Sequence, residues 1–113
     1  MDHGMAEDER LVYLRSEHHG SESRYLTARR VLSGDLWIEG QDLGPCTEIV
    51  APDGEYEWVW VVAADEVNEL LGTLDAPPDT DVLNELAARW TGEASYELER
   101  RLREGGLAKL HVV

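Results

Sequence analysis

The segment from Glu55 to Val62 has the strict alternation of a strand that buries one face. One face would carry Tyr56, Trp58, Trp60 and Val62, and the other Glu55, Glu57, Val59 and Val61. From residue 67 onward the apolar residues recur instead at i, i+3, i+4 and i+7, which is typical of helices. This change of period predicts a chain that begins with strands and ends with helices.

Two shorter stretches before Glu55 also have strand character. The sequence predicts strands over 24–32 and 36–39, joined by a tight turn at Ser33-Gly34-Asp35, and a shorter apolar run at 11–14. The polar stretch 16–23 and the Gly-, Pro- and Asp-rich stretch 40–54 are predicted as loops. These connections are too short for crossover helices, so neighbouring strands are expected to be antiparallel.

The second half predicts helices separated by Pro77-Pro78 and by Thr91-Gly92. Asp79 or Thr80 is the expected cap of the middle helix. Gly105-Gly106 is expected to end the last helix, and 107–113 to form a short final strand. The expected inward residues are, in chain order, Val67, Leu70, Leu71, Leu74, Val82, Leu83, Leu86, Ala87, Trp90, Ala94, Leu98 and Leu102.

Together these elements predict an α+β fold, an antiparallel sheet of about four strands covered on one face by two or three C-terminal helices. Residues 10–113 are expected to form one domain, and residues 1–9 a flexible N-terminus. The chain has 113 residues and no Phe, so its aromatic packing must come from four Trp and four Tyr. Each of these rings carries a polar group that needs a partner when buried.

Charge is distributed very unevenly along the chain. Between Arg30 and Arg89 there is no Lys or Arg, and the 58 intervening residues carry fourteen carboxylates. The flanks are balanced, so the formal net charge of −14 comes from this base-free stretch. Such a surface repels nucleic acid and anionic lipid and attracts basic proteins. If its carboxylates gather on one exterior patch, a cationic partner is expected.

The sequence therefore favours a non-enzymatic protein-binding domain that engages a basic macromolecular partner. An immunity protein or antitoxin and a nucleic-acid mimic are the versions considered, and an acidic surface that serves only solubility is an alternative. The predicted binding residues centre on the stretch 37–57, with Trp37 as an exposed aromatic anchor. They are Trp37, Glu39, Asp42, Glu48, Asp53, Glu55 and Glu57.

A small hydrolase or metal-dependent enzyme is the other alternative. Glu55 and Glu57 share a strand face and can form a general acid–base pair, but exposure that protects a strand edge from pairing is the favoured explanation. His18-His19 is a weak metal pair, because adjacent strand residues point to opposite faces. Asp75, Asp79 and Asp81 lack the glycine and the closing glutamate of a calcium loop. The sequence predicts no catalytic residue, no metal and no cofactor.

The cysteine content and the hydropathy of the chain bear on its location. Cys46 is alone, which excludes an internal disulfide and favours a reducing compartment. No apolar run approaches the length of a membrane span, and the N-terminus is unlike a secretory signal. A cytoplasmic, bacterial protein that binds neither membrane nor nucleic acid directly is expected, with its oligomeric state open.

The run from Leu36 to Pro45 (LWIEGQDLGP), followed by Glu55-Tyr56-Glu57-Trp58, resembles a group of small acidic actinobacterial proteins of unassigned function. The resemblance covers residues 24–104. It implies one compact domain in which a strand, a loop and an aromatic strand precede a Leu-rich helical half. It implies no catalytic residue.

Overall fold

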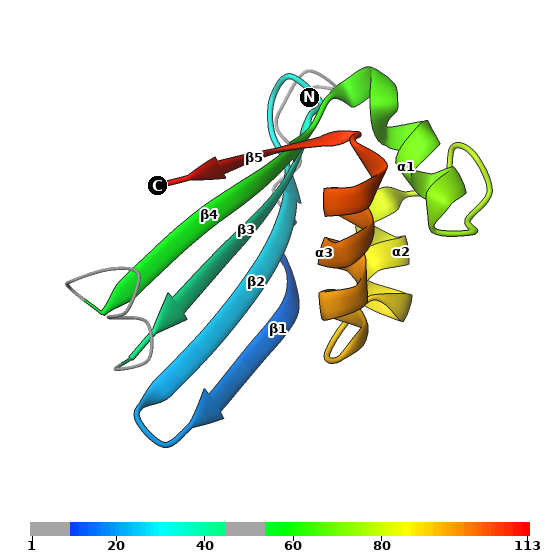
Figure 1. The fold of residues 1–113 in the computed structure, drawn as a ribbon. Helices are drawn as coiled ribbons and strands as arrows, with labels where there is room; N and C mark the ends of the chain where they lie inside the picture. The colour runs from blue at the N-terminus through cyan, green and yellow to red at the C-terminus, as the bar shows by residue number, and fades with distance from the viewer. Residues whose placement is uncertain (1–9, 45–53) are drawn as a thin grey trace, which may run out of the picture.

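The computed structural model describes residues 10–44 and 54–113, and its fold is α+β. A five-stranded antiparallel sheet has the strand order β1-β2-β3-β4-β5, so the spatial order follows the chain (Figure 1). The strands are β1 (Val12–His19), β2 (Glu22–Arg30), β3 (Leu36–Leu43), β4 (Glu55–Val62) and β5 (Ala108–Val112).

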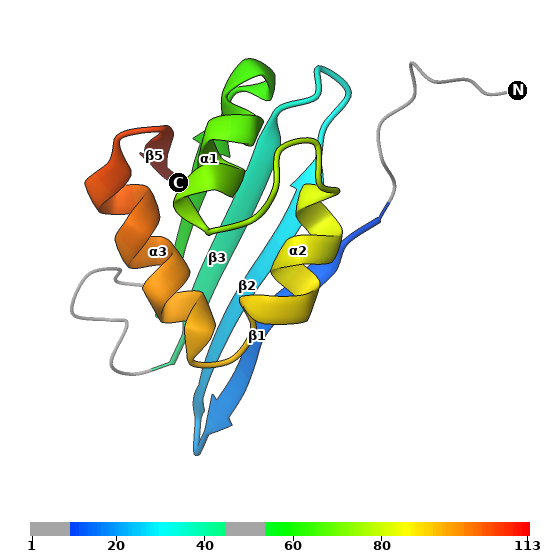
Figure 2. The same cartoon turned by 90° about the vertical axis from the view of Figure 1, so that its right-hand side faces the viewer.

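All the described helices lie between β4 and β5 in the chain. They are the 3-10 turn η2 (Ala64–Glu66) and the α-helices α1 (Val67–Thr73), α2 (Val82–Arg89) and α3 (Ala94–Gly105). Figure 2 shows the three α-helices side by side over one face of the sheet. Within the described ranges, none of the helices is both long and apolar enough to cross a lipid bilayer.

The predicted architecture is confirmed, with one strand more than the four expected. β4 has the predicted boundaries, and the expected final strand is β5, which pairs with β4. Gly106 makes this return possible, because its φ of 74° lies in the left-handed region that ends helices. The tight turn before β3 is also confirmed, with Gly34 at φ 93° donating its N–H to the Val31 carbonyl.

Two predicted loops were wrong in part, because polar strand residues were taken for loop residues; residues 45–53 of the second loop lie outside the described residues. β1 continues to His19, and a two-residue turn at Gly20-Ser21 leads directly into β2. Residues 40–43 belong to β3, where β2 and β4 pair with them on both sides. Backbone pairing and polar cross-strand neighbours hold these residues in the sheet, although their sequence shows no apolar alternation.

The hydrophobic core lies between the sheet and the helices. Its sheet side is formed by Leu14, Leu26, Ala28, Leu36, Ile38, Trp60 and Val62. The predicted inward residues of the helices are buried or pack against this core, except Ala87, which is exposed. The predicted cap of α2 was also wrong: Asp81 fills the position, and its carboxylate accepts the Asn84 backbone N–H at 3.0 Å.

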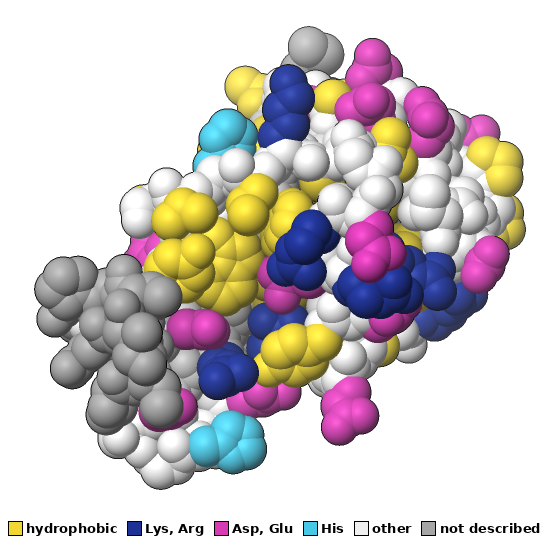
Figure 3. Space-filling view, viewed as in Figure 1, with side chains coloured by type: hydrophobic (Ala, Val, Ile, Leu, Met, Phe, Trp, Pro, Cys, Tyr) yellow, Lys and Arg dark blue, Asp and Glu magenta, His cyan; other side chains and the backbone are white. Residues whose placement is uncertain are grey.

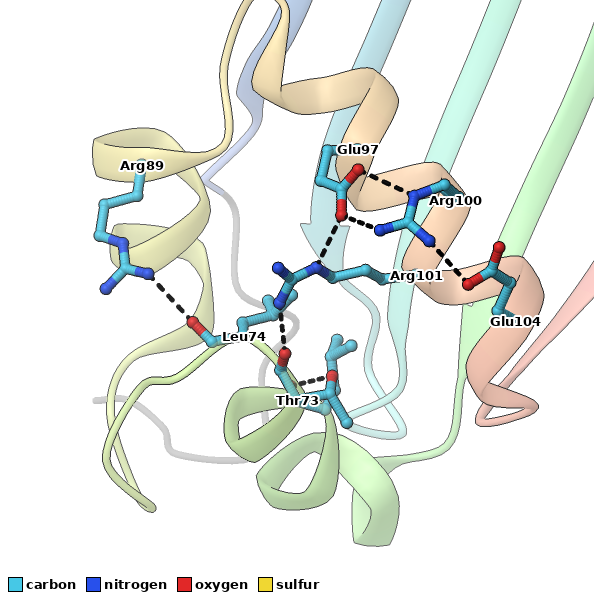
Figure 4. A network of polar contacts seen from close by, with 8 residues as sticks. Thr73, Leu74, Arg89, Glu97, Arg100, Arg101 and Glu104 are labelled. Atoms are coloured by element: carbon cyan, nitrogen blue, oxygen red, sulfur yellow. Dashed lines mark hydrogen bonds and ion pairs between the residues drawn. The ribbon is translucent and has the colours of Figure 1, made fainter.

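Arginines of α2 and α3 satisfy the last carbonyls of α1 (Figure 4). Arg101 donates to the Thr73 carbonyl at 2.7 Å, and Arg89 to the Leu74 carbonyl at 3.0 Å. On α3, Glu97 accepts hydrogen bonds from both Arg100 and Arg101. These two guanidinium groups lower the pKa of Glu97 from 4.5 to about 2.

Because the folded-state pKa of Glu97 is below its unfolded value, its ionised form stabilises the fold above pH 4.5, and that contribution is lost toward pH 2. We expect Glu97→Gln to lower the melting temperature at pH 7 by a small amount that added salt reduces further. The difference from wild type should disappear as the pH falls from 4.5 to about 2. Thermal denaturation across this range measures it.

Glu93→Gln is the matched control, since Glu93 is an exposed carboxylate at the N-terminal cap of the same helix. An equal loss in both variants, or a Glu97→Gln effect independent of pH, contradicts the assignment.

Candidate functional site

One face of the sheet carries none of the described helices (Figure 1). Strand alternation places the outward residues of β1 to β4 on this uncovered face. They include Tyr13, Tyr25, Thr27, Arg29, Trp37, Glu39, Gln41, Glu55 and Glu57. Tyrosine, tryptophan and carboxylate side chains from four strands therefore share one surface.

Gln41 holds two carboxylates of β4 together on the uncovered face. Its side-chain nitrogen donates to Glu55 Oε2 at 2.7 Å and to Glu57 Oε2 at 3.0 Å. The two carboxylates repel each other. The two hydrogens of the Gln41 amide offset this repulsion, because each donates a hydrogen bond to one of the carboxylates. The Gln41 amide therefore bridges the two carboxylates of β4.

The uncovered face contains a cavity of about 450 Å³ beside this pair. We call it the sheet cavity, and its lining includes Tyr13, Tyr25, Thr27, Glu39, Gln41 and Glu57. Tyr13 is 60% exposed, so its ring is presented to solvent at the rim. Tyrosine faces together with carboxylates suit a cationic group, which the ring quadrupole and the negative charges both attract.

Trp37 and Glu39 interact with a base from β2. Arg29 donates to Glu39 Oε1 at 3.0 Å, and its guanidinium carbon lies 5.2 Å from the centre of the Trp37 ring. The predicted aromatic anchor is therefore on the uncovered face but half-buried, with a cation of the protein already beside it.

The predicted binding residues do not form one group. Trp37, Glu39, Glu55 and Glu57 lie together on the uncovered face, whereas Asp42 points to the helix side. Glu48 and Asp53 lie outside the described residues, as does Cys46.

The single exterior patch expected for the base-free stretch is not what the described residues show. Strand alternation separates Glu39 from Asp42, and η2, α1, α2 and the segment between α1 and α2 carry a second acidic group on the other side of the sheet. That second group contains Asp65, Glu66, Glu69, Asp75, Asp79, Asp81 and Glu85.

His18 and Asp79, which were considered for metal binding, have other partners. His18 Nδ1 lies 3.0 Å from Ser23 Oγ, and its ring packs edge-on against Tyr25, whereas His19 points to the opposite face. Asp79 and Asn68 exchange two hydrogen bonds. Among the residues that the structure describes, no three His, Cys, Asp or Glu side chains group as metal ligands do.

The helix side contains a buried polar network that the sequence reasoning missed. The Glu99 carboxylate on α3 accepts one hydrogen bond from Arg15 of β1, at 2.9 Å, and one each from the Trp58 and Trp60 indoles of β4, both at 2.8 Å. Arg15 also donates to Ser95 at 3.0 Å. Arg15 is 3% exposed and Glu99 is 8% exposed. We call Arg15, Trp58, Trp60, Ser95 and Glu99 the Glu99 network.

Two features of the sequence indicate part of this network. Buried indoles need acceptors, and Glu99 follows Leu98 directly on the inward side of α3. The position of Arg15 could not be inferred, because a register shift between Tyr13 and Arg15 buries both Leu14 and Arg15, which alternation would place on opposite faces.

Gly40 gives Trp58 the space for its position in the network. A Cβ atom at residue 40 would lie 2.2 Å from two carbons of the Trp58 ring, far inside contact distance. The indole therefore lies directly against the β3 backbone, where Gly40 pairs with Trp58.

Comparison with known proteins gives no match: no family model, no curated protein and no solved structure is significantly similar to this chain. The resemblance to small acidic actinobacterial proteins therefore stays a prediction.

We expect Gly40→Ala to displace the Trp58 indole and to lower the free energy of unfolding by about 1–3 kcal/mol. Gly72→Ala is the matched control, because Gly72 lies in α1 and nothing would meet its Cβ within 4 Å. That change should stabilise the protein by about 0.5–1 kcal/mol. Urea denaturation measures both, and unchanged stability of Gly40→Ala would show that Trp58 can move at no cost.

We expect Glu99→Ala to lower the free energy of unfolding by about 3–5 kcal/mol, because it leaves the Arg15 charge and two indole N–H groups buried without their acceptor. Glu104→Ala, on the exposed side of the same helix, should cost less than about 1 kcal/mol. Near-UV circular dichroism should change with Glu99→Ala alone. Equal losses in the two variants would remove the special role of Glu99.

Proposed function

We propose that this protein is a non-enzymatic binding domain whose uncovered sheet face engages a basic protein. The sheet cavity carries the proposal: tyrosine rings and carboxylates converge on a space of about 450 Å³, which suits a lysine or arginine side chain. The net charge of −14 supports it, since it would accelerate the approach of a cationic partner.

The uncovered face supplies a geometry that net charge alone lacks. Gln41 keeps Glu55 and Glu57 adjacent, and Glu57 and Glu39 both line the sheet cavity. A carboxylate held in place loses less side-chain entropy when a cation binds than a freely rotating one does. This geometry favours a partner protein that inserts a basic side chain into the sheet cavity over a polycation held only by long-range attraction.

The narrower versions of this function are part of the same proposal. An immunity- or antitoxin-like protein would mask a basic enzyme, and a nucleic-acid mimic would occupy a phosphate-binding cleft. Both need a basic protein surface and neither needs contact with nucleic acid or membrane. A cytoplasmic location, which the lone cysteine favours, and the bacterial origin that the resemblance implies belong to this proposal as well.

Binding of a fluorescent oligo-arginine peptide tests the proposal. We expect the double variant Glu39→Gln/Glu57→Gln to weaken binding at least about tenfold, since charge-assisted contacts are worth about 1.5–3 kcal/mol each. Tyr13→Ser should weaken it by about two- to fivefold through loss of a cation–π contact. Fluorescence anisotropy at low and at physiological salt measures both effects.

The double variant Asp65→Asn/Glu69→Gln is the matched control. It also removes two negative charges, but from exposed residues of η2 and α1 on the helix side of the sheet. It should keep most of the affinity. If both double variants weaken binding equally, net charge alone accounts for the attraction. If the wild-type chain does not bind the peptide at low salt, the acidic surface serves another purpose.

A further inference from the structure

A groove of about 210 Å³ lies beside the Glu99 network, on the opposite side of the sheet from the sheet cavity. We call it the helix-side groove, and its lining includes Arg24, Asp42, Tyr56, Trp58, Tyr96 and Arg103. Figure 3 shows hydrophobic side chains gathered between the strands and the helices, with basic and acidic side chains along their border. The groove thus combines aromatic surface with both signs of charge.

Trp58 and Tyr56 give the helix-side groove a fixed aromatic wall. Their ring centres are 5.4 Å apart, with the planes inclined by 33°. The indole of Trp58 is fixed by its hydrogen bond to Glu99 and by its contact with the β3 backbone at Gly40. A wall held in place before binding favours flat, rigid ligands, which lose little freedom on stacking against it.

Asp42 offers the helix-side groove an acceptor that lacks a donor. Within residues 10–44 and 54–113, its Oδ1 is the buried side-chain oxygen that has no hydrogen-bond partner. Burial raises the pKa of the Asp42 carboxyl, and Arg24 and Arg15 offset part of this rise. A buried oxygen without a donor is costly, so a ligand gains that free energy if a rotation of the Asp42 carboxylate brings this oxygen to its N–H group.

Arg103 supplies a cation at the same groove. Its guanidinium carbon lies 5.6 Å from the centre of the Trp60 ring, and in the described part of the chain it forms no ion pair. Arg24 lies across from Asp42 in the pairing of β2 with β3. An anionic group can therefore be met by Arg103, with Arg24 also at the groove.

We propose that the helix-side groove binds a small planar aromatic molecule that carries an N–H donor and an anionic group. The ring would stack on Trp58 and Tyr56, the N–H would donate to Asp42, and the anion would meet Arg103. Indole carboxylic acids and purine nucleoside monophosphates share this chemistry. The groove is below the range of about 300–1,000 Å³ typical of drug-sized ligands, which favours one or two fused rings.

Titration of the full chain with indole-3-acetate and, separately, with guanosine 5′-monophosphate tests this site. Binding is followed by calorimetry and by the NMR resonance of the Trp58 indole N–H. We expect at least one probe to bind and to shift that resonance. Binding by indole-3-acetate alone identifies a small aromatic acid, and binding by the nucleotide alone a nucleotide-like ligand.

Arg103→Gln should weaken binding by about tenfold, because it removes a charge-assisted contact. Arg100→Gln is the matched control, since Arg100 belongs to the same helix and contacts Glu97 and Glu104 on its exposed side. It should keep the affinity within about twofold. The proposal is overturned if neither probe binds or if the two arginine variants lose affinity equally. Either result leaves the proposed function of the uncovered face unaffected, because the two surfaces lie on opposite sides of the sheet.

Discussion

The hydrogen bonds that the buried Glu99 carboxylate accepts are the interactions on which most of this structure depends. The carboxylate joins β1, β4 and α3 by accepting hydrogen bonds from Arg15, Trp58 and Trp60. A buried ion pair is weak support for stability by itself, because desolvation offsets much of its attraction. The Glu99 carboxylate matters because of its position. It holds the indoles of Trp58 and Trp60 in place, and Trp58 forms a wall of the helix-side groove.

The sheet places on opposite faces two sets of side chains that alternate along the sequence. Neighbouring residues of β3 alternate between the uncovered face, with Glu39 and Gln41, and the helix side, with Gly40 and Asp42. The sheet cavity combines tyrosines with carboxylates, and the helix-side groove combines tryptophans and tyrosines with arginines and carboxylates. A chain of strong negative charge can therefore present an aromatic groove with basic and acidic side chains on one side of the sheet and a cavity lined by tyrosines and carboxylates on the other.

Most of the fold could be predicted because its apolar residues are periodic. The β4 boundaries and the inward residues of α1 follow directly from spacing, and they agree with the structure. Polar strand ends such as 16–19 and 40–43 could not be predicted, since pairing with neighbouring strands decides them. For the candidate site, four of the seven chosen residues share a face. The Glu99 network was missed because its partners Arg15 and Glu99 lie 84 residues apart and a register shift places Arg15 inside.

The strand order also bears on how the molecule is assembled. The connections from β1 to β2 and from β2 to β3 are short, so these strands can pair early in folding from contacts near in sequence. Arg15 lies on β1, whereas its acceptor Glu99 lies on α3, near the end of the chain. Burial of Arg15 therefore depends on a segment near the end of the chain, and a chain that lacked α3 would leave this charge on the helix side of the sheet without its acceptor.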